Sequence, residues 1–331
     1  MARIADVTVL FLRDTFSSTA IGPMEVFRHA GTLWNSFTGE QAIPRFRVTT
    51  ASIDGKAVPC DGPLFIQPSA SLKSIRKTDL IFIPSTGLGI DDVVERNAPV
   101  VPWLHRWHER GVPIASVCSG VGLVAATGLL DGKRATTHWS LARRFSEKYP
   151  KVNWMPELMV TNDGLFYCGG GVNAALDLSL YLVERFCGHE VAVQSAKAML
   201  IETPRTWQAG FATISLKTMH TDERISQAQE WIHEHFHQNL PVDYAARQAG
   251  MSLRNFVRRF KQATGDSPLQ YLQKLRIGAA KRLLEQDHRT LQEVSDAVGY
   301  QDVAFFRKMF QRHAGTSPST YRQKFGRALP Q

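Results

Sequence analysis

The chain has 331 residues, of which 44% are hydrophobic and 21% charged, a composition that suits a folded globular protein with room for two domains. We expect a cytoplasmic protein with no membrane partner, because the longest early apolar run, Val7 to Leu12, is too short for a signal-peptide core or a membrane span. We also expect no cofactor and no bound metal, since the four cysteines form no CxxC pair. The net charge of +9 is unevenly distributed: residues 223–331 hold 17 Lys and Arg against 10 Asp and Glu, whereas residues 1–222 hold 22 against 20. This excess of positive charge favours a polyanion as partner of the C-terminal part, although a solvated basic surface explains the charge alone equally well.

Apolar strand-like runs alternate with helical patterns through the first two thirds of the chain. In chain order the strands read "VTVLFL", "RFRVTTAS", "DLIFIPS" and "IASVC", and they are followed by "RATTHW" and "LFYCGGGVNAALDLSLYLVERFCG". This alternation predicts an α/β domain over residues 1–200, with a mostly parallel sheet covered by helices on both faces.

Ligands of such sheets bind at the carboxyl ends of the strands, and several candidate residues stand there. Cys118 ends the strand "IASVC", Gly87 lies in the turn "STGLG", and His138 lies in "ATTHW". The run 169–171, "GGG", offers either bare amides for an anion or a tight packing turn. The ligand-binding candidates are Thr19, Gly87, Cys118, Ser119 and His138.

The stretch "PIASVCSGVGLVAATGLLDGKRATTHWS", together with "IGPMEVF" near the start, resembles the PfpI/class I glutamine-amidotransferase-like superfamily over residues 5–195. The resemblance implies a flavodoxin-like fold with Cys118 on a strained strand-to-helix turn, where the helix N-terminus lowers the thiol pKa. Some members of the superfamily are hydrolases, amidases or isocyanide hydratases.

The residues around Cys118 argue against catalysis. In the enzyme relatives an acidic residue stands four positions before the proline of the "GP" motif, and counting back from Pro23 places Thr19 there. Protease-like relatives carry histidine directly after the cysteine, where this chain has Ser119. His138 without an orienting acid is half of a catalytic pair. We therefore predict an effector pocket rather than an enzyme, with no catalytic residue.

Three other interpretations of Cys118 stay open. The first is a cysteine-dependent amide or isonitrile hydrolase or hydratase with a DNA-binding tail. The second is a redox sensor, to which Cys168 could contribute if the fold brings it close. The third is a small buried hydrophobic residue. Glu25 in "GPMEVF" could belong to the site only if it points toward Cys118, and a role within its own helix is favoured.

The C-terminal third contains a repeat at a spacing of 50 residues. The two copies read "AGMSLRNFVRRFKQATGDSPLQYLQKLR" and "VGYQDVAFFRKMFQRHAGTSPSTYRQKF". In each copy a short helix ends at a glycine, and a polar residue, Ser252 or Asp302, should cap the next helix. Paired phenylalanines four residues apart should pack inward, which leaves a basic outer face. Each copy is therefore predicted to be a helix-turn-helix unit.

Between the copies, "SPLQYLQKLRIGAAKRLLEQ" predicts one helix of about 18 residues, roughly 27 Å long. Such a helix can hold two recognition helices about one DNA turn, ~34 Å, apart. The triple "HEHFH" at 233–237 suggests a metal site only weakly, because no acidic or cysteine ligand follows at a suitable spacing.

Residues 223–326 resemble the AraC-type DNA-binding domain. The resemblance is carried by the repeat and by the stretch "GDSPLQYLQKLRIGAAKRLLEQ". By position in that pattern, the outer face of the two helices supplies base-reading candidates, and two further cations are expected to bind phosphates. The base-reading candidates are Arg254, Val257, Arg258, Val303, Ala304, Arg307 and Lys308, and the phosphate candidates are Lys261 and Arg312.

Fused behind an amidotransferase-like domain, this arrangement resembles that of the GlxA-type transcriptional regulators. The resemblance implies an effector-binding and dimerisation domain over 1–200, a linker over 201–222 and a DNA-binding domain over 223–331. It implies a homodimer that binds double-stranded promoter DNA, activates transcription in response to a small nitrogen-containing metabolite, and can contact RNA polymerase.

Overall fold

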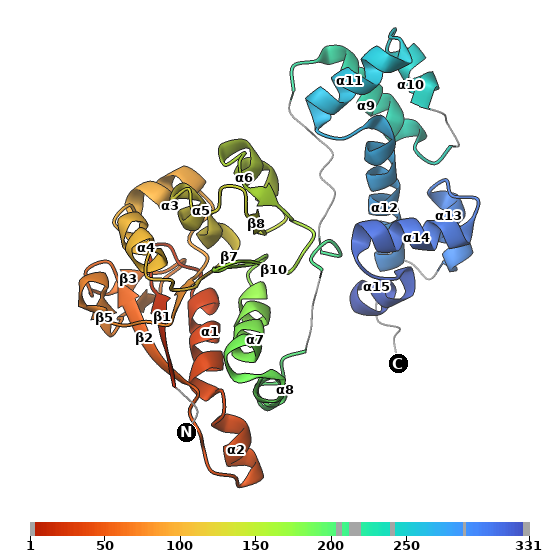
Figure 1. The fold of residues 1–331 in the computed structure, drawn as a ribbon. Helices are drawn as coiled ribbons and strands as arrows, with labels where there is room; N and C mark the ends of the chain where they lie inside the picture. Colours follow the sequence, from red (N-terminus) through yellow and green to blue (C-terminus); the bar gives the residue numbers. More distant parts are fainter. Residues whose placement is uncertain (1–3, 203–206, 212–219, 239–241, 287–288, 327–331) are drawn as a thin grey trace. The chain divides into compact units, whose positions relative to one another are not determined.

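The computed structural model describes residues 4–202, 207–211, 220–238, 242–286 and 289–326 (Figure 1). The chain divides into two compact units, Met1–Gln208 and Ala209–Gln331. The expected linker over 201–222 includes residues 203–206 and 212–219, which lie outside the described residues. Within the described parts, no helix has both the length and the apolar character needed to cross a membrane.

The first unit is built on a seven-stranded sheet in the order β10-β11-β7-β6-β1-β2-β5. Every neighbouring pair in it is parallel except β10 and β11, which are antiparallel. The strands are β1 (Ala5–Leu10), β2 (Phe46–Ser52), β5 (Ala70–Ser71), β6 (Leu80–Ile83), β7 (Ile114–Val117), β10 (Val160–Asp163) and β11 (Phe166–Gly169). Two short pairs stand beside it, β3 (Val58–Pro59) with β4 (Phe65–Ile66), and β8 (Arg134–Ala135) with β9 (Asn153–Trp154).

Helices cover both faces of this sheet, which explains why β6 and β7 are apolar and buried along their whole length (Figure 1). One layer contains α1 (Ser18–His29), α2 (Leu33–Thr38), α7 (Ala174–Cys187) and α8 (His189–Ala198). The other contains α3 (Ile90–Arg96), α4 (Val100–His108) and α5 (Val121–Ala126), and α6 (Ala142–Lys148) follows β8. The predicted flavodoxin-like, mostly parallel architecture is confirmed.

The second unit is helical and contains the two predicted repeats, confirming the all-α class. The first repeat pairs α10 (Val242–Gln248) with α11 (Leu253–Thr264), and the second pairs α13 (Leu291–Ala297) with α14 (Val303–Ala314). α9 (Glu223–His235) precedes them, α12 (Pro268–Gln286) joins them, and α15 (Pro318–Phe325) follows. The four repeat phenylalanines are fully buried in two separate cores, as predicted: Phe256, Phe260, Phe306 and Phe310.

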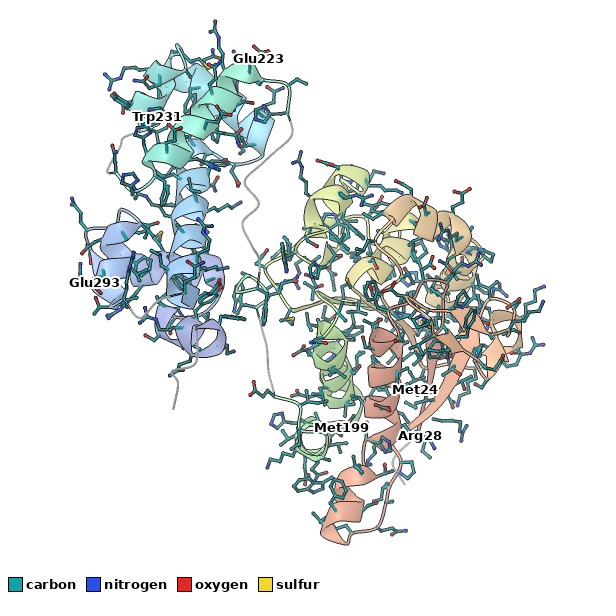
Figure 2. The ribbon with its side chains drawn as sticks, turned by 180° about the vertical axis from the view of Figure 1, so that it is seen from behind. Met24, Arg28, Met199, Glu223, Trp231 and Glu293 are labelled. Atoms are coloured by element: carbon teal, nitrogen blue, oxygen red, sulfur yellow. The ribbon has the colours of Figure 1, made fainter. Side chains whose placement is uncertain are left out.

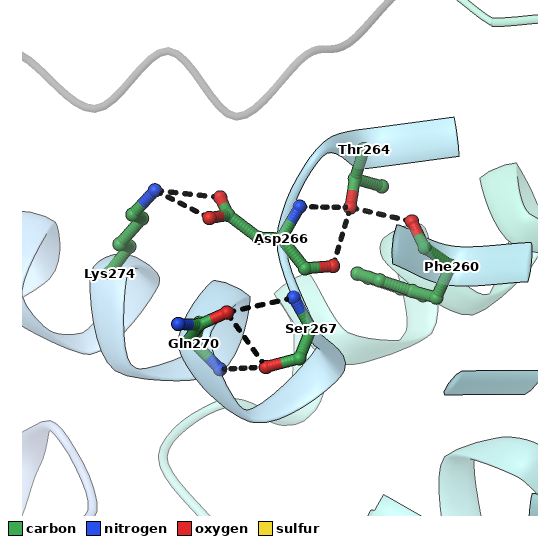
Figure 3. A network of polar contacts seen from close by, with 6 residues as sticks. All are labelled: Phe260, Thr264, Asp266, Ser267, Gln270 and Lys274. Carbon is green, nitrogen blue, oxygen red and sulfur yellow. Dashed lines mark hydrogen bonds and ion pairs between the residues drawn. The ribbon is translucent and has the colours of Figure 1, made fainter. Parts of the chain in front are cut away.

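The turn from α11 into α12 is held by polar contacts that the "TGDSPLQ" sequence supplies (Figure 3). The Thr264 hydroxyl donates to the Phe260 carbonyl oxygen at 2.7 Å, and the Lys274 ammonium binds both carboxylate oxygens of Asp266 at 2.7 and 2.8 Å. The Ser267 hydroxyl and amide both donate to the Gln270 side-chain oxygen. These contacts fix the start of α12, where Pro268 lies in the first turn.

The caps of the recognition helices are not equivalent. Asp302 caps α14 as expected, because its carboxylate accepts from the amides of Ala304 and Phe305 at 2.7 and 3.3 Å. Ser252 occupies the same position before α11, but its side chain makes no capping hydrogen bond, so that expectation was wrong. α13 has a complete capping box between Thr290 and Glu293, whose side chain stands at the start of that helix (Figure 2).

Arg276 in α12 joins the two halves of the second unit. It is buried, and its guanidinium donates to the carbonyl oxygens of Phe236 at 2.7 Å and Gln238 at 2.8 Å. The same group lies 5.1 Å from the centre of the Tyr300 ring, in the turn before α14. One side chain thus contacts the residues just after α9 and the turn of the second repeat.

Candidate ligand site and nucleic-acid interface

The carboxyl ends of β1, β6 and β7, which are neighbours in the sheet, carry most of the predicted ligand residues. Cys118 follows β7 directly, residues 84–87 follow β6, and Thr19 lies at the start of α1 after β1. Thr15 and Thr86 form an isolated antiparallel bridge between two of these loops. The structure therefore brings Thr19, Gly87, Cys118 and Ser119 to one edge of the sheet, as expected for a parallel α/β domain.

Cys118 has the strained backbone of a nucleophile elbow. Its φ is +55°, in the left-handed region that residues with a side chain rarely adopt, and the residue is only 3% exposed. A side chain at Gly120 would overlap the Pro84 carbonyl oxygen, so the turn can pack against the end of β6 only with glycine there.

The electrostatics of Cys118 differ from those that the resemblance implies. Burial raises the pKa of the Cys118 thiol, and this effect outweighs the hydrogen bonds from the Ser85 side chain and the Ser119 backbone, which act in the opposite direction. The expected lowering of the thiol pKa was therefore wrong, because removal from solvent penalises the thiolate more than its neighbours stabilise it.

Thr19 and Ser119 use their hydroxyl groups to hold the loop after β6. The Thr19 hydroxyl donates to the Phe16 carbonyl oxygen at 2.7 Å and accepts from the Ser85 amide at 3.0 Å. The Ser119 hydroxyl accepts from the Thr86 amide at 2.9 Å and donates to the Thr86 carbonyl oxygen at 3.0 Å. Both side chains are buried, and these hydrogen bonds of both are made within the protein.

His138 has the properties of a neutral hydrogen-bonding group. Its Nδ1 accepts from the Ser140 amide at 3.1 Å and lies 2.6 Å from the Ser140 hydroxyl, which places the ring proton on Nε2. Burial lowers the pKa of the imidazole, which favours the uncharged ring. Of the interactions between described residues, none joins His138 to the Cys118 thiol or to a carboxylate. The ring lies beside Gly171, where an added Cβ would be 3.0 Å from its Cδ2 atom.

Sequence reasoning missed four residues at this edge of the sheet. Ser85 and Thr86 stand in the "STGLG" turn, of which only Gly87 was selected, and the buried Thr86 hydroxyl has no partner among the described atoms. Thr137, next to His138, donates its hydroxyl to the Cys118 carbonyl oxygen at 2.8 Å. Gln208 comes from the expected linker and gave no sequence signal at all.

Two other sequence hypotheses can be placed. Glu25 lies in α1 with an exposed side chain. His233 binds the Tyr271 hydroxyl at 2.8 Å, and His235 binds the Trp231 carbonyl oxygen at 2.8 Å and stacks on the Trp231 ring. A search of the described chain finds no group of His, Cys, Asp and Glu that could hold a metal ion.

The outer face of α11 gathers all four candidates of the first repeat. Arg254, Arg258 and Lys261 are exposed, Val257 is half-buried, and all four line one open hollow of about 760 Å³. Leu253 and Gln262, which the sequence analysis did not select, line it too. Arg259 on the same helix points elsewhere and pairs with Asp222 at 2.8 Å, which makes it a structural residue.

The outer face of α14 presents the second set. Ala304, Arg307, Lys308 and Arg312 are exposed, and Val303 is half-buried. Phe305 was missed, because the sequence offers phenylalanines at this helix mainly as core; it is 46% exposed, next to the Tyr300 ring. Each recognition helix therefore shows cations together with an apolar group, the combination that reads guanine edges and thymine methyl groups.

Comparison with known proteins agrees with both halves of this description. The DJ-1/PfpI family matches residues 6–185, and a family described as a helix-turn-helix domain matches residues 245–324. The HTH-type transcriptional regulator CdhR of Pseudomonas aeruginosa is 26% identical over 276 residues, covering 83% of this chain and 81% of its own. The HTH-type transcriptional regulator GlxA of Rhizobium meliloti is 29% identical over 226 residues, covering 67% of this chain and 69% of its own.

Among solved structures, Drosophila melanogaster DJ-1beta superposes with a TM-score of 0.52 at 23% identity, covering 61% of this chain and all of that one. At that identity the likeness establishes the fold of the first unit and no more.

Proposed function

This chain belongs to the DJ-1/PfpI family and carries an AraC-type helix-turn-helix domain, and from this premise we propose that it is a sequence-specific transcriptional regulator, an activator that responds to a small nitrogen-containing ligand. The second unit binds double-stranded promoter DNA, and the first binds the ligand and mediates homodimer formation. The observation that carries the proposal is the pair of recognition helices, each with a basic outer face and each built on its own core. Regulators with the same architecture support it.

The ligand site we propose is the edge of the sheet around Cys118, with Thr19, Gly87, Ser119 and His138. Thr19 weighs against a catalytic role, because it stands where the enzyme relatives have their acid and its hydroxyl is engaged in two backbone contacts. His138 can donate a hydrogen bond from Nε2 to a ligand, and no carboxylate among the described residues orients it as a base.

The second candidate function is cysteine-dependent hydrolysis or hydration of an amide or isonitrile. The positive φ of Cys118 favours it, because the strained elbow is retained. The raised thiol pKa and Thr19 weigh against it. Turnover of amides, nitriles or isonitriles that disappears in Cys118→Ala would replace our proposal with this one.

A redox role is weaker still. Cys168 lies on β11 opposite Ser116, and its Sγ accepts from the Ser116 hydroxyl at 3.8 Å. Burial raises the pKa of Cys168 to about 11, which leaves it a poor resolving thiolate. Promoter binding that is insensitive to peroxide would remove this candidate.

The DNA-binding proposal is tested by selecting binding sites from random duplexes with the full-length protein. Arg258→Ala should relax base preference at one position, whereas Lys261→Ala should weaken binding to all sequences by a similar factor. Affinity for the selected site should fall steeply between 50 and 200 mM salt, by roughly 0.9 log units per log unit of salt for each phosphate contact. A protein that enriches no sequence over the random pool would overturn the proposal.

The ligand is sought by thermal shift of the full-length protein against amino acids, betaines and related amines, since a ligand that binds only the folded state raises Tm. His138→Ala should abolish the shift that any hit produces. The same shift in His138→Ala would place the ligand elsewhere.

A further inference from the structure

Gln208 is the last residue of the first unit, and its side chain is buried at the ligand site. The residue is only 2% exposed, although it follows the final helix of the unit and directly precedes the second. Its neighbour Trp207 forms an isolated bridge with Leu158, and the Gln208 amide donates to the Glu157 carbonyl oxygen at 2.9 Å. The backbone at this point is therefore fixed to the first unit at Glu157 and Leu158.

The Gln208 side-chain amide group is bound by three acceptors. Its two Nε2 hydrogens are shared among the Thr137 carbonyl oxygen at 2.7 Å, the Thr136 hydroxyl at 3.1 Å and the Leu158 carbonyl oxygen at 3.1 Å. Three acceptors around one nitrogen also fix which end of the side chain is the nitrogen. Gln208 thus holds the short segment that leads from β8 to His138.

That segment in turn holds the elbow. The Thr137 hydroxyl donates to the Cys118 carbonyl oxygen at 2.8 Å, so a chain of two hydrogen bonds joins Gln208 to the strained residue. The side-chain amide group of Gln208 also lies against Gly170, where an added Cβ would be 2.6 to 2.7 Å from the atoms of that group. Gly171, the next residue, lies against the His138 ring. Gln208 and His138 therefore flank the same glycine turn.

The other polar atom of the Gln208 side chain is not satisfied among the described residues. This atom, Oε1, is buried and has no hydrogen-bond partner in the described part of the chain. An unpaired buried acceptor costs about 1–3 kcal/mol, and such atoms are rare in native proteins. An apolar side chain would avoid that cost but could not bind the three acceptors.

We propose that Gln208 is a positioning residue of the ligand site, which holds the Thr136–His138 segment and, through Thr137, the Cys118 elbow. Because Gln208 is also the residue from which the chain leaves for the DNA-binding unit, the ligand site and the start of the connector are one hydrogen-bonded structure. This inference rests on the proposed function for its regulatory meaning, but its test does not involve DNA or a ligand.

The test measures how fast N-ethylmaleimide labels each cysteine of the full-length protein, followed by peptide mass spectrometry. Gln208→Ala should label Cys118 about tenfold faster than the natural chain, because the segment that holds the elbow is released. Gln67→Ala is the matched control, since Gln67 is an exposed amide that binds the Gly55 carbonyl oxygen and should change nothing. Equal Cys118 rates in Gln208→Ala and the natural chain would overturn the proposal.

Cys60 distinguishes positioning from general loosening. It is buried directly after β3, away from the Thr136–His138 segment, and its labelling should stay slow in Gln208→Ala. If Cys60 accelerates as much as Cys118, Gln208 stabilises the whole unit and has no special relation to the elbow.

Gly170→Ala supplies an independent variant that leaves Gln208 in place. The three atoms nearest to its new Cβ, at 2.6 to 2.7 Å, all belong to the Gln208 side chain, so the substitution should displace the amide and accelerate Cys118 labelling as Gln208→Ala does. In the double variant, Gly170→Ala should add nothing further, because the side chain that it displaces is gone. Additive effects of the two substitutions would contradict the proposed contact.

Discussion

Asp302 and Ser252 stand at equivalent positions before the two recognition helices, yet only Asp302 binds the free amides of its helix. We predict that Asp302→Ala lowers the local stability of α14 by about 1 kcal/mol, whereas Ser252→Ala changes α11 by only a few tenths. Hydrogen exchange of the amides of Ala304 and Phe305, compared with the corresponding amides of α11, measures both effects. Equal losses at the two helices would mean that Ser252 forms its cap in solution.

Cys118 leads to a prediction about pH. Burial raises the pKa of its thiol, so the thiolate form appears at higher pH than in a free cysteine. The labelling rate of Cys118 should therefore keep rising about tenfold per pH unit beyond pH 9, whereas the same peptide in denatured protein levels off there. A plateau below pH 8 in the folded protein would show a reactive, low-pKa cysteine and revive the enzyme hypothesis.

Among individual residues, sequence reasoning predicted those that belong to a motif and missed those whose side chains only hold other residues in place. Cys118 and Thr19 were found because a resemblance gives their positions meaning. Ser85 and Thr137 could not be found, because a buried hydroxyl that binds another hydroxyl, as Ser85 does with Ser119, or a backbone oxygen, as Thr137 does, leaves no pattern in the sequence. Gln208 was invisible for a stronger reason, since it lies more than 70 residues from its partners Thr136 and Thr137.

Among the elements, α12 has the most consequential role, because the relation between the two repeats depends on it. We predict that Arg276→Met destabilises the second unit by about 2–3 kcal/mol, since two carbonyl oxygens lose a charged donor and the Tyr300 ring loses its cation. Arg282→Met, on the exposed side of the same helix, should have little effect. Urea denaturation followed by hydrogen exchange in α12 and α14 compares the two variants. Equal stability of the Arg276→Met and Arg282→Met variants would show that α12 alone, without the Arg276 contacts, holds the two repeats together.

Elements with a strong period were predictable and short ones were not. The tandem repeat gave both recognition helices and the connecting helix, because apolar spacing, glycine turns and Pro268 agree with one another. The two-residue strands of the β3–β4 and β8–β9 pairs carry too few residues for any alternation to be visible. The antiparallel direction of β10 was missed for a related reason, since strand direction depends on the turn at 164–165 and not on composition.

For the molecule as a whole, two recognition helices on one rod make the proposed regulator a reader of two subsites at a fixed separation. α12 has 19 residues, roughly 28 Å at 1.5 Å per residue, which is close to one turn of DNA. Arg276 and the α11–α12 turn tie this helix to both repeats, so we expect the separation to stay fixed on DNA. Affinity should therefore depend on the spacing of the two subsites as strongly as on their sequence.

We predict that inserting about 5 base pairs between the subsites of the selected site turns the second subsite to the opposite face of the duplex and reduces affinity to that of a single subsite. In Arg307→Ala, which weakens DNA binding by the second recognition helix only, the same insertion should reduce affinity much less, because that helix contributes less to binding. Electrophoretic mobility shifts at constant salt measure all four combinations of protein and site. An insertion that the natural protein tolerates, with full affinity, would mean that the repeats bind independently and that α12 does not fix their separation.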